Sequence, residues 1–344
     1  MALRMSQLAR SSRELPDRPQ NRPQAEPSTA PQSAPPPPPP DAEPPPDAVD
    51  PLQVYRHLVK AGQSVYDAPA EGRTPDLVQV TGVLRQAYGL LKEKNAALLA
   101  ETVRHRSRSY TWPERGANTA VLSMRLGVEL EFDERRVVGV GLCALMHDLG
   151  MLTIPPEVLN SRKLNDEQFA LLRRHPLESQ RLILGFGETL AWAGKVVIQV
   201  HERHNGNGYP RGLRGDQIHE LAGIIGLADT YQAMAHPRAD RKAMVIYNAL
   251  SEIINLRNQL FDQRLVKALI HIVSIFPLGS LVQLNNGAIG RVVATSKLHP
   301  TRPTLEILLD RHHRRLESPE ALDLSQEPML YITDPAIDED VLEK

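Results

Sequence analysis

Four segments of the chain carry side chains of the types that bind divalent metal ions. They contain His147-Asp148 at the end of an apolar run, His175 before a proline, His201 after a second apolar run, and Asp229 within a third. Imidazole nitrogens and carboxylate oxygens together suit borderline metals such as iron, manganese or zinc. The sequence therefore indicates a metal site assembled from several segments.

Each histidine has a simpler structural alternative. His147-Asp148 alone could be a buried histidine beside a capping aspartate, His175 a surface residue, and His201 a buried residue at the inner end of a helix. Pro176 should kink the helix after His175 and turn the imidazole ring. The histidines are therefore informative only as a set.

Asp229 is the most informative single residue. It shares a helical stripe with Leu221 and Ile225, which predicts that its carboxylate is buried. Burying a carboxylate costs several kcal/mol unless it is paired or binds a metal. Pairing with an arginine is the alternative, and we favour metal ligation.

A glycine-bearing turn follows His201 directly. Residues 204–210 read His-Asn-Gly-Asn-Gly-Tyr-Pro, and glycine and asparagine supply the conformations that turns need. An ordinary loop is the alternative. The turn is expected to place Tyr209 at the mouth of the space that the helix ends enclose.

The elements that must position these residues are mostly helices. Apolar residues recur at helical spacing from Pro51 onward, and Asp133 and Asp166 are placed to cap two of the helices. After Pro277 the pattern predicts a β-hairpin with a turn at 285–287. The predicted helices cover 118–130, 133–147, 166–175, 189–204, 219–235, 242–260 and 262–275, and the predicted strands cover 281–284, 289–294, 304–309 and 329–332.

The composition divides the chain into four parts. Residues 1–50 hold nearly half of the 29 prolines and are expected to be a disordered tail. Residues 51–103 are expected to form a helical N-terminal module or added helices, residues 104–276 the main helical domain, and residues 277–335 a small β-rich extension. The predicted fold class is mainly α, a helical bundle with a small C-terminal β extension.

The bulk properties exclude several classes of function. A net charge of −1 gives no global electrostatic case for nucleic acid as a partner. No apolar stretch reaches the roughly 20 residues of a membrane helix, and the N-terminus lacks an apolar signal core, so no membrane insertion and a cytoplasmic location are expected. The single Cys143 lies in an apolar run and is expected to be a buried hydrophobic residue.

The motifs taken in order resemble the bacterial HD-GYP family of metal-dependent phosphohydrolases. They are HD at 147–148, His-Pro at 175–176, HERHNGNGYP at 201–210, LADTYQAM at 227–234 and PRADRK at 237–242. The resemblance covers residues ~100–310, because the segment FPLGSLVQLNNGAIGRVV also looks like a β extension found in members. It implies an HD-type helical bundle that holds two or more ions, usually iron or manganese, and hydrolyses cyclic di-GMP.

The resemblance also implies roles for individual residues. His147, Asp148 and Asp229 match the ligands of one ion, and Asp148 would bridge to a second ion held by His175 and His201. Because it bridges, Asp148 is the residue on which catalysis is expected to depend. Tyr209 matches the motif tyrosine beside the substrate pocket, and Arg238 and Arg241 match residues that contact phosphate.

The early part of the family pattern is altered. The family has a histidine ligand in a stretch that corresponds to residues 110–120. Counting forward from Tyr110 places Glu114 there, and counting back from Asn118 places Arg115 there. A carboxylate from Glu114 could replace the histidine as a metal ligand, whereas the permanently charged guanidinium of Arg115 could not.

Three further positions depart from the family pattern. Val200 stands where the family has a second histidine, Met151 where it has a lysine, and Gln232 where it has a second aspartate. The sequence therefore predicts a phosphodiesterase in cyclic di-GMP signalling whose hydrolysis is weak.

Three readings of the function stay open. The first is an active enzyme that uses Glu114, the second an inactive cyclic di-GMP receptor, and the third a protein-interaction scaffold. Expected partners are cyclic di-GMP and a signalling protein such as a diguanylate cyclase.

Overall fold

The structure is a computed structural model that describes most of the chain after residue 48. The described residues are 49–93, 96–104, 111–159, 161, 164–235, 246–255, 259–273, 280–296, 299 and 301–334. The proline-rich segment and two of the predicted site residues, Arg238 and Arg241, lie outside these ranges.

The structure has three helices in residues 51–104, the region for which the apolar spacing predicted helices. They are α1 (Pro51–Asp67), α2 (Leu77–Lys92) and α3 (Ala96–Arg104). Aspartates begin two of them, because Asp50 accepts a hydrogen bond from the amide of Leu52, and Asp76 caps α2 in the same way. Their apolar faces join the core of the later helices, since Leu58 and Leu84 are fully buried in it.

The centre of the fold is the pair α4 (Trp112–Glu129) and α5 (Glu134–Met146). Asp133 caps α5 through the amide of Arg136, as predicted. The predicted start of α4 at residue 118 was too late. Thr111 caps this helix, and Glu114 completes a capping box with it.

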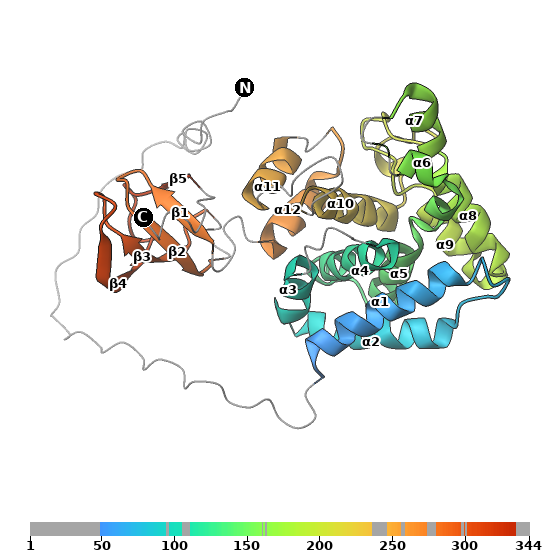
Figure 1. Cartoon of the computed structure of the whole chain (residues 1–344), viewed down its shortest axis with the longest axis horizontal. Coiled ribbons are helices and arrows are strands. Elements are labelled where there is room, and N and C mark those ends of the chain that lie inside the picture. The colour runs from blue at the N-terminus through green and yellow to red at the C-terminus, as the bar shows by residue number, and fades with distance from the viewer. Residues whose placement is uncertain are drawn as a thin grey trace, which may run out of the picture. The chain divides into compact units, whose positions relative to one another are not determined.

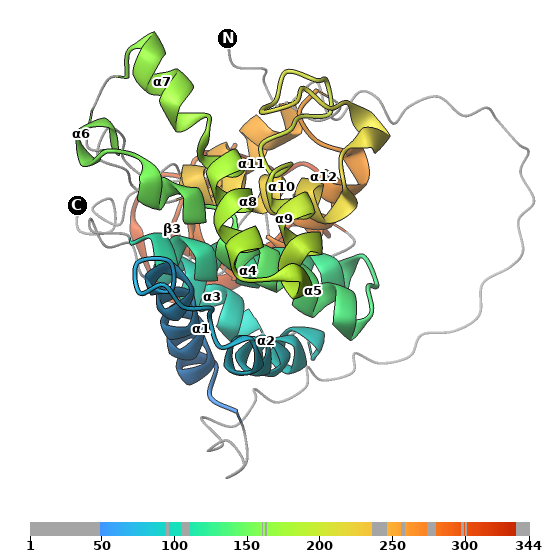
Figure 2. The same ribbon diagram turned by 90° about the vertical axis from the view of Figure 1, so that its right-hand side faces the viewer.

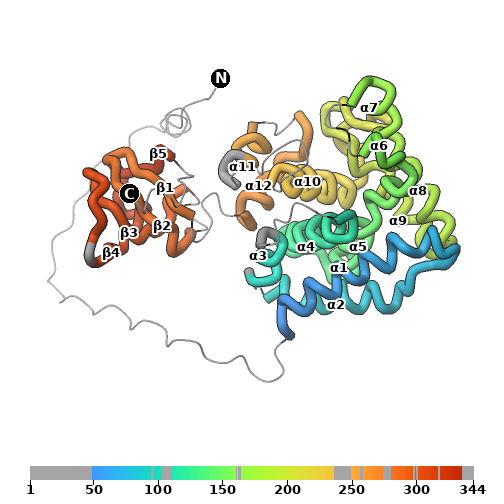
Figure 3. Tube along the Cα trace, viewed as in Figure 1, coloured from blue at the N-terminus to red at the C-terminus, as the bar shows by residue number. Residues whose placement is uncertain are grey.

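The remaining helices build the other side of the bundle. In chain order they are α6 (Pro156–Leu159), α7 (Asp166–Leu172), α8 (His175–Gly185), α9 (Ala191–Val197), α10 (Glu220–Ala235), α11 (Ile246–Asn255) and α12 (Gln263–Ile272). Figure 1 and Figure 2 show α1 and α2 on one side of α4 and α5, with α8, α9 and α10 on the opposite side. The trace in Figure 3 follows the chain from α5 through α6 and α7 into α8.

Three boundaries differ from the sequence prediction for local reasons. Asn165, not Asp166, caps α7 and forms a capping box with Gln168. Pro176 does not kink a continuous helix but lies in the first turn of the new helix α8, where a proline costs no hydrogen bond. The helix predicted over 189–204 ends at Val197, because a turn and an irregular loop follow it.

One apolar segment has the length and composition of a membrane-spanning helix. Among the described residues, the stretch Glu134–Thr153 is long and apolar enough to cross a membrane, but 78% of its apolar window is buried within the protein. Cys143 lies in it, unpaired and buried as predicted, and burial raises the pKa of its thiol. The segment is the central helix of the core.

The C-terminal part is an antiparallel sheet of five strands in the order β4-β3-β2-β1-β5. The predicted hairpin is confirmed, with Gly287 in its turn at a φ of 92° that favours glycine. The sequence prediction missed β4 and placed the last strand too early. The strands are β1 (Leu281–Leu284), β2 (Ile289–Ala294), β3 (Thr304–Leu309), β4 (Arg315–Asp323) and β5 (Ile332–Asp334).

The sheet has a small apolar core of its own. Its most deeply buried strand residues are Val282, Leu284, Val292 and Leu305. At the turn between β3 and β4 the carboxylate of Asp310 accepts hydrogen bonds from the backbone and side chain of Arg314. This carboxylate therefore organises the turn.

Candidate metal centre

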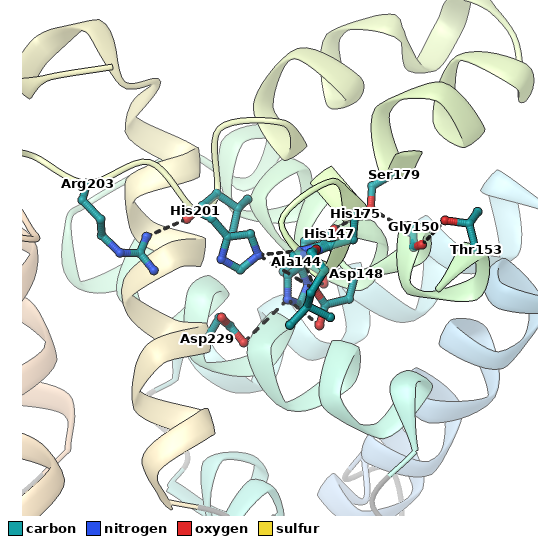
Figure 4. Close-up of polar contacts among 12 residues, drawn as sticks. Ala144, His147, Asp148, Gly150, Thr153, His175, Ser179, His201, Arg203 and Asp229 are labelled. Atoms are coloured by element: carbon teal, nitrogen blue, oxygen red, sulfur yellow. Dashed lines mark hydrogen bonds and ion pairs between the residues drawn. The ribbon is translucent and has the colours of Figure 1, made fainter. Parts of the chain in front are cut away.

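His147 and Asp148 directly follow the last residue of α5, so the buried helix delivers both side chains to the interior (Figure 4). The Nδ1 atom of His147 donates to the carbonyl oxygen of Ala144 at 2.7 Å. The neutral ring then carries its lone pair on Nε2, the atom that faces the site. Both His147 and Asp148 are buried, with 1% and 6% of their surface exposed.

Ser179 of α8 fixes the turn that follows. Its hydroxyl accepts a hydrogen bond from the amide of Gly150 at 2.8 Å and donates one to the carbonyl oxygen of His147 at 2.8 Å. A Cβ at Gly150 would overlap the backbone of His175 and Ser179, so only glycine fits there. Ser179 was not predicted as a site residue, because a single serine in a helix forms no recognisable pattern.

His175 and His201 approach the same point from two other segments. His175 is the first residue of α8, and its Nδ1 donates to the carbonyl oxygen of Leu172 at 2.8 Å. His201 lies in the turn after α9, not at the helix end that the sequence predicted. Gly226 of α10 makes that turn possible, since a Cβ there would overlap the carbonyl oxygen of Val200.

The ligand atoms form two groups that share Asp148. Within each group, Asp148 with His175 and His201 or Asp148 with His147 and Asp229, the candidate atoms lie within 4.8 Å of one another. His175 Nε2 lies 3.4 Å from Asp148 Oδ1, and His147 Nε2 lies 3.7 Å from Asp229 Oδ1. Figure 4 shows the five side chains converging from separate segments.

Asp229 differs in burial from the sequence prediction. Its side chain keeps 24% of its surface exposed, whereas the helical stripe predicted a buried carboxylate. It points toward His147 rather than into the packed core (Figure 4). A partly hydrated carboxylate costs less to ionise, and it still lies beside the buried imidazole.

The donor set fits divalent metal ions. Among the described residues, Asp148 Oδ1 is buried without a hydrogen-bond partner, a costly arrangement that a bound ion would relieve. Ligand atoms about 2.1 Å from one ion lie about 3 to 3.5 Å apart. The separations of 2.9 Å between His175 Nε2 and His201 Nε2 and of 3.4 Å between His147 Nε2 and Asp148 Oδ2 match that spacing.

The histidines differ in their electrostatics. Burial acts to lower the pKa of His147, but the charges of Asp148 and Asp229 outweigh it and raise that pKa to about 9. Burial lowers the pKa of His175. Burial and the charge of the neighbouring His175 lower the pKa of His201 well below its usual value. His175 and His201 are therefore neutral ligands at neutral pH, whereas an ion must displace a proton from His147.

Tyr209 covers the histidine pair. Its ring stacks on His201 with ring centroids 5.1 Å apart and an angle of 5° between the planes. The guanidinium of Arg173 lies 5.2 Å from the centre of the Tyr209 ring. Burial and the charge of Asp148 raise the pKa of the Tyr209 hydroxyl, which keeps it protonated.

Glu202 holds the loop that carries Tyr209. This buried carboxylate accepts hydrogen bonds from the amides of Arg211 at 2.7 Å and Leu213 at 2.9 Å, on the far side of the loop. The amide of Tyr209 in turn donates to the carbonyl oxygen of His201 at 3.1 Å. The role of Glu202 was not predicted, although a glutamate directly after His201 is part of the motif.

Glu114 lies outside both ligand groups among the described residues. Its carboxylate accepts hydrogen bonds from the amide of Thr111 at 2.7 Å and its hydroxyl at 2.9 Å. The neighbouring Arg115 places its guanidinium 4.7 Å from the centre of the Trp112 ring. In this arrangement the Glu114 carboxylate caps the N-terminus of α4.

The other altered positions are buried without a metal-binding nitrogen. Val200 is part of the main core, with 1% of its surface exposed. Met151 packs in a small apolar cluster with Ile154 and Val158. Gln232 is buried in α10.

Comparisons with known proteins agree with the fold. A family model described as an HD domain matches residues 87–265, and one described as a KOW domain associated with HD domain matches residues 281–344. A solved structure, the HDG"Y"P protein Bd1817 from Bdellovibrio bacteriovorus, aligns with a TM-score of 0.52 at 18% identity, over 63% of this chain and 69% of that one. At that identity the likeness concerns the fold alone.

Three relatives have named activities. The chain is 32% identical over 225 residues to the cyclic di-GMP phosphodiesterase PA4108 of Pseudomonas aeruginosa, covering 64% of this chain and 53% of that protein. It is 27% identical to the cyclic di-GMP phosphodiesterase PdeB of Borreliella burgdorferi, covering 56% and 51%. It is 31% identical to the 3'3'-cGAMP-specific phosphodiesterase 1 of Vibrio cholerae, covering 51% and 40%. The chain thus spans about half the length of these relatives or less.

Proposed function

The chain belongs to the HD domain family, and on that basis we propose that it is an HD-GYP-type phosphohydrolase that acts on a cyclic dinucleotide. The observation that carries the proposal is the pair of three-residue ligand groups that share Asp148. Cyclic di-GMP is the proposed substrate, because relatives named for its hydrolysis match this chain. A signalling protein such as a diguanylate cyclase is the proposed partner.

The site residues divide the work between two proposed ions. His147, Asp148 and Asp229 would hold one, and Asp148, His175 and His201 the other, with iron or manganese the metals that suit these donors. Bound ions would polarise a phosphoryl oxygen and lower the pKa of a water nucleophile. Tyr209 lies against His201, where it would line the substrate side.

Phosphate recognition completes the proposal. Arg238 and Arg241 are proposed to contact the phosphates, a task for which guanidinium groups are well suited. Both residues lie outside the described part of the chain, so their role rests on the sequence motif.

We propose that hydrolysis is slow. Val200 and Met151 occupy the places of a family histidine and lysine, and both are packed in apolar surroundings. Glu114 is engaged in capping α4, which leaves each ion with three protein ligands. Fewer ligands weaken the hold on the ion and on the water nucleophile.

The decisive experiment combines metal analysis with turnover. The purified full chain would be stripped with a chelator, reloaded with Mn²⁺ or Fe²⁺, and incubated with cyclic di-GMP and with 3'3'-cGAMP. The expected result is slow, metal-dependent hydrolysis that Asp148→Ala abolishes. Fast hydrolysis would contradict the slow-turnover proposal, and a loaded protein that neither hydrolyses nor binds either nucleotide would contradict the proposed substrate.

The retained motif residues support a second candidate function, that of a receptor. Tyr209 and both basic residues of the motif are present although ligand positions are lost. Tight binding of cyclic di-GMP without turnover, weakened by Arg238→Ala, would select this function over hydrolysis.

A further inference from the structure

Tyr66 is a buried tyrosine whose hydroxyl has no hydrogen-bond partner among the described residues. It lies in the last turn of α1, a helix that precedes the residues matched by the HD domain family model. Only 4% of its surface is exposed. An unpaired buried hydroxyl is costly, so such a group calls for an explanation.

The packing of three helices brings this turn toward the metal centre. One turn before Tyr66, Gly62 lets α1 approach α4 so closely that a Cβ there would lie 3.2 Å from the carbonyl oxygen of Pro113. On α4, a Cβ at Gly116 would lie 3.1 Å from the carbonyl oxygen of Leu145, two residues before His147. These small residues place the ends of α1, α4 and α5 together.

The electrostatics agree with this placement. Burial and then the charge of Asp148 raise the pKa of the Tyr66 hydroxyl well above its usual value, and Asp229 adds to the shift, while Arg115 opposes it. The hydroxyl therefore lies within the field of two members of the ligand group, and it stays protonated at neutral pH. Toward oxygen atoms with negative charge, the protonated hydroxyl acts as a hydrogen-bond donor.

A donor and an acceptor are thus unpaired in the same region. Tyr66 offers an O–H, Asp148 Oδ1 offers lone pairs, and neither has a hydrogen-bond partner among the described residues. Since they do not bond to each other, a third atom that accepts from the hydroxyl would satisfy Tyr66, and an ion would satisfy Asp148. Water that completes the coordination of an ion would meet the first requirement.

We propose that Tyr66 is a positioning residue of the metal centre, whose hydroxyl donates a hydrogen bond to water that completes the coordination of the ion at His147, Asp148 and Asp229. This inference rests on the proposed metal-dependent function and extends the site to a helix outside the matched HD domain residues. Groups that hold metal ligands in this way typically change metal affinity by ten- to a hundredfold when removed.

The test compares Tyr66→Phe with a matched control on the same helix. Tyr55 is also buried, but its hydroxyl donates to Asn118 Oδ1 at 2.7 Å. Mn²⁺ binding to the full chain would be measured by calorimetry, and thermal unfolding would be followed after chelation. Tyr66→Phe should weaken Mn²⁺ binding about tenfold or more while the chelated protein melts no lower than wild type, because an unpaired hydroxyl contributes no stability. Tyr55→Phe should do the reverse, melting lower with unchanged Mn²⁺ affinity.

Four results would overturn the proposal. Unchanged Mn²⁺ affinity in Tyr66→Phe would make Tyr66 a filler of space. A lower melting temperature of chelated Tyr66→Phe would mean that the hydroxyl bonds within the protein. A visible absorption band of the ferric protein that disappears in Tyr66→Phe would make Tyr66 a direct ligand. A wild-type chain that binds no Mn²⁺ or iron would refute the proposed metal site as well, whereas the first three results leave that site standing.

Discussion

The Nε2 atoms of His175 and His201 face each other at 2.9 Å inside the protein. His175 uses its other nitrogen to donate to the carbonyl oxygen of Leu172, so its Nε2 carries a lone pair in the neutral ring. A cation that replaces the proton between the two nitrogens would bind both lone pairs. The same two atoms lie 3.4 and 3.9 Å from Asp148 Oδ1, which completes a face of three donors.

Single substitutions should separate the two ions. His175→Ala should reduce bound Mn²⁺ from about two ions per chain to about one, His147→Ala should do the same at the other group, and Asp148→Asn should weaken both. Elemental analysis after gel filtration measures the ratio, with the exposed His271→Ala as control. Full metal content in both His175→Ala and His147→Ala would contradict the assignment of ligands.

Removal of Glu202 should release the Tyr209 loop. Glu202→Ala leaves the amides of Arg211 and Leu213 without their acceptor, which should lower the free energy of unfolding by about 2 to 3 kcal/mol. Limited proteolysis of the folded protein should then cut within residues 205–213 sooner, and Glu202→Gln should fall between Ala and wild type. The exposed Glu188→Ala is the control, and equal proteolysis rates in all variants would refute the role.

Gly150 should tolerate no side chain. In Gly150→Ala the new Cβ would overlap the carbonyl oxygen of His175 and approach the amide nitrogen of Ser179, so the backbone must shift. We expect a loss of at least about 3 kcal/mol in the free energy of unfolding, measured by urea denaturation. The matched control is Gly185→Ala at the end of α8, where no atom lies within 4 Å, and it should be stabilising by about 0.5 to 1 kcal/mol. Equal stability of the two variants would refute the prediction.

The turn between β3 and β4 should stay intact in acid. Hydrogen bonds from Arg314 lower the pKa of the half-buried Asp310 carboxylate to about 2. Because the folded pKa lies below the unfolded value of about 3.9, the carboxylate favours the folded state fully above pH 3.9 and loses this contribution as the pH falls toward 2. A carbon-13 NMR titration of the side chain would measure this pKa, with Asp310→Asn identifying the signal. An inflection near pH 4 would contradict the assigned contacts.

The sequence was sufficient to predict most of the helical fold because apolar residues at helical spacing mark buried faces. It also predicted the first hairpin of the sheet. It did not reveal β4, whose residues Arg315–Asp323 include charges and Pro319. Such residues are typical of an edge strand, the position that β4 has in the sheet.

The site also contains residues that the sequence predicted and residues that it did not. The histidines and aspartates that the motifs marked are brought together by the structure, because helix ends and turns deliver them to one point. Ser179 and Tyr66 could not be found from patterns, since each acts through packing between segments far apart in the chain. Glu114 is different, because Thr111 three residues earlier is the signature of a capping box, and the sequence itself carried the signal for that contact.

Asp148 and Asp229 belong to the same ligand group although they lie far apart in the chain. These residues are separated by about eighty residues of chain, and the entropy of closing a loop grows with its length. An ion held by both would act as a removable cross-link between the end of α5 and the middle of α10, as a disulfide does permanently. The stability of this half of the bundle would then increase with the concentration of free metal ion.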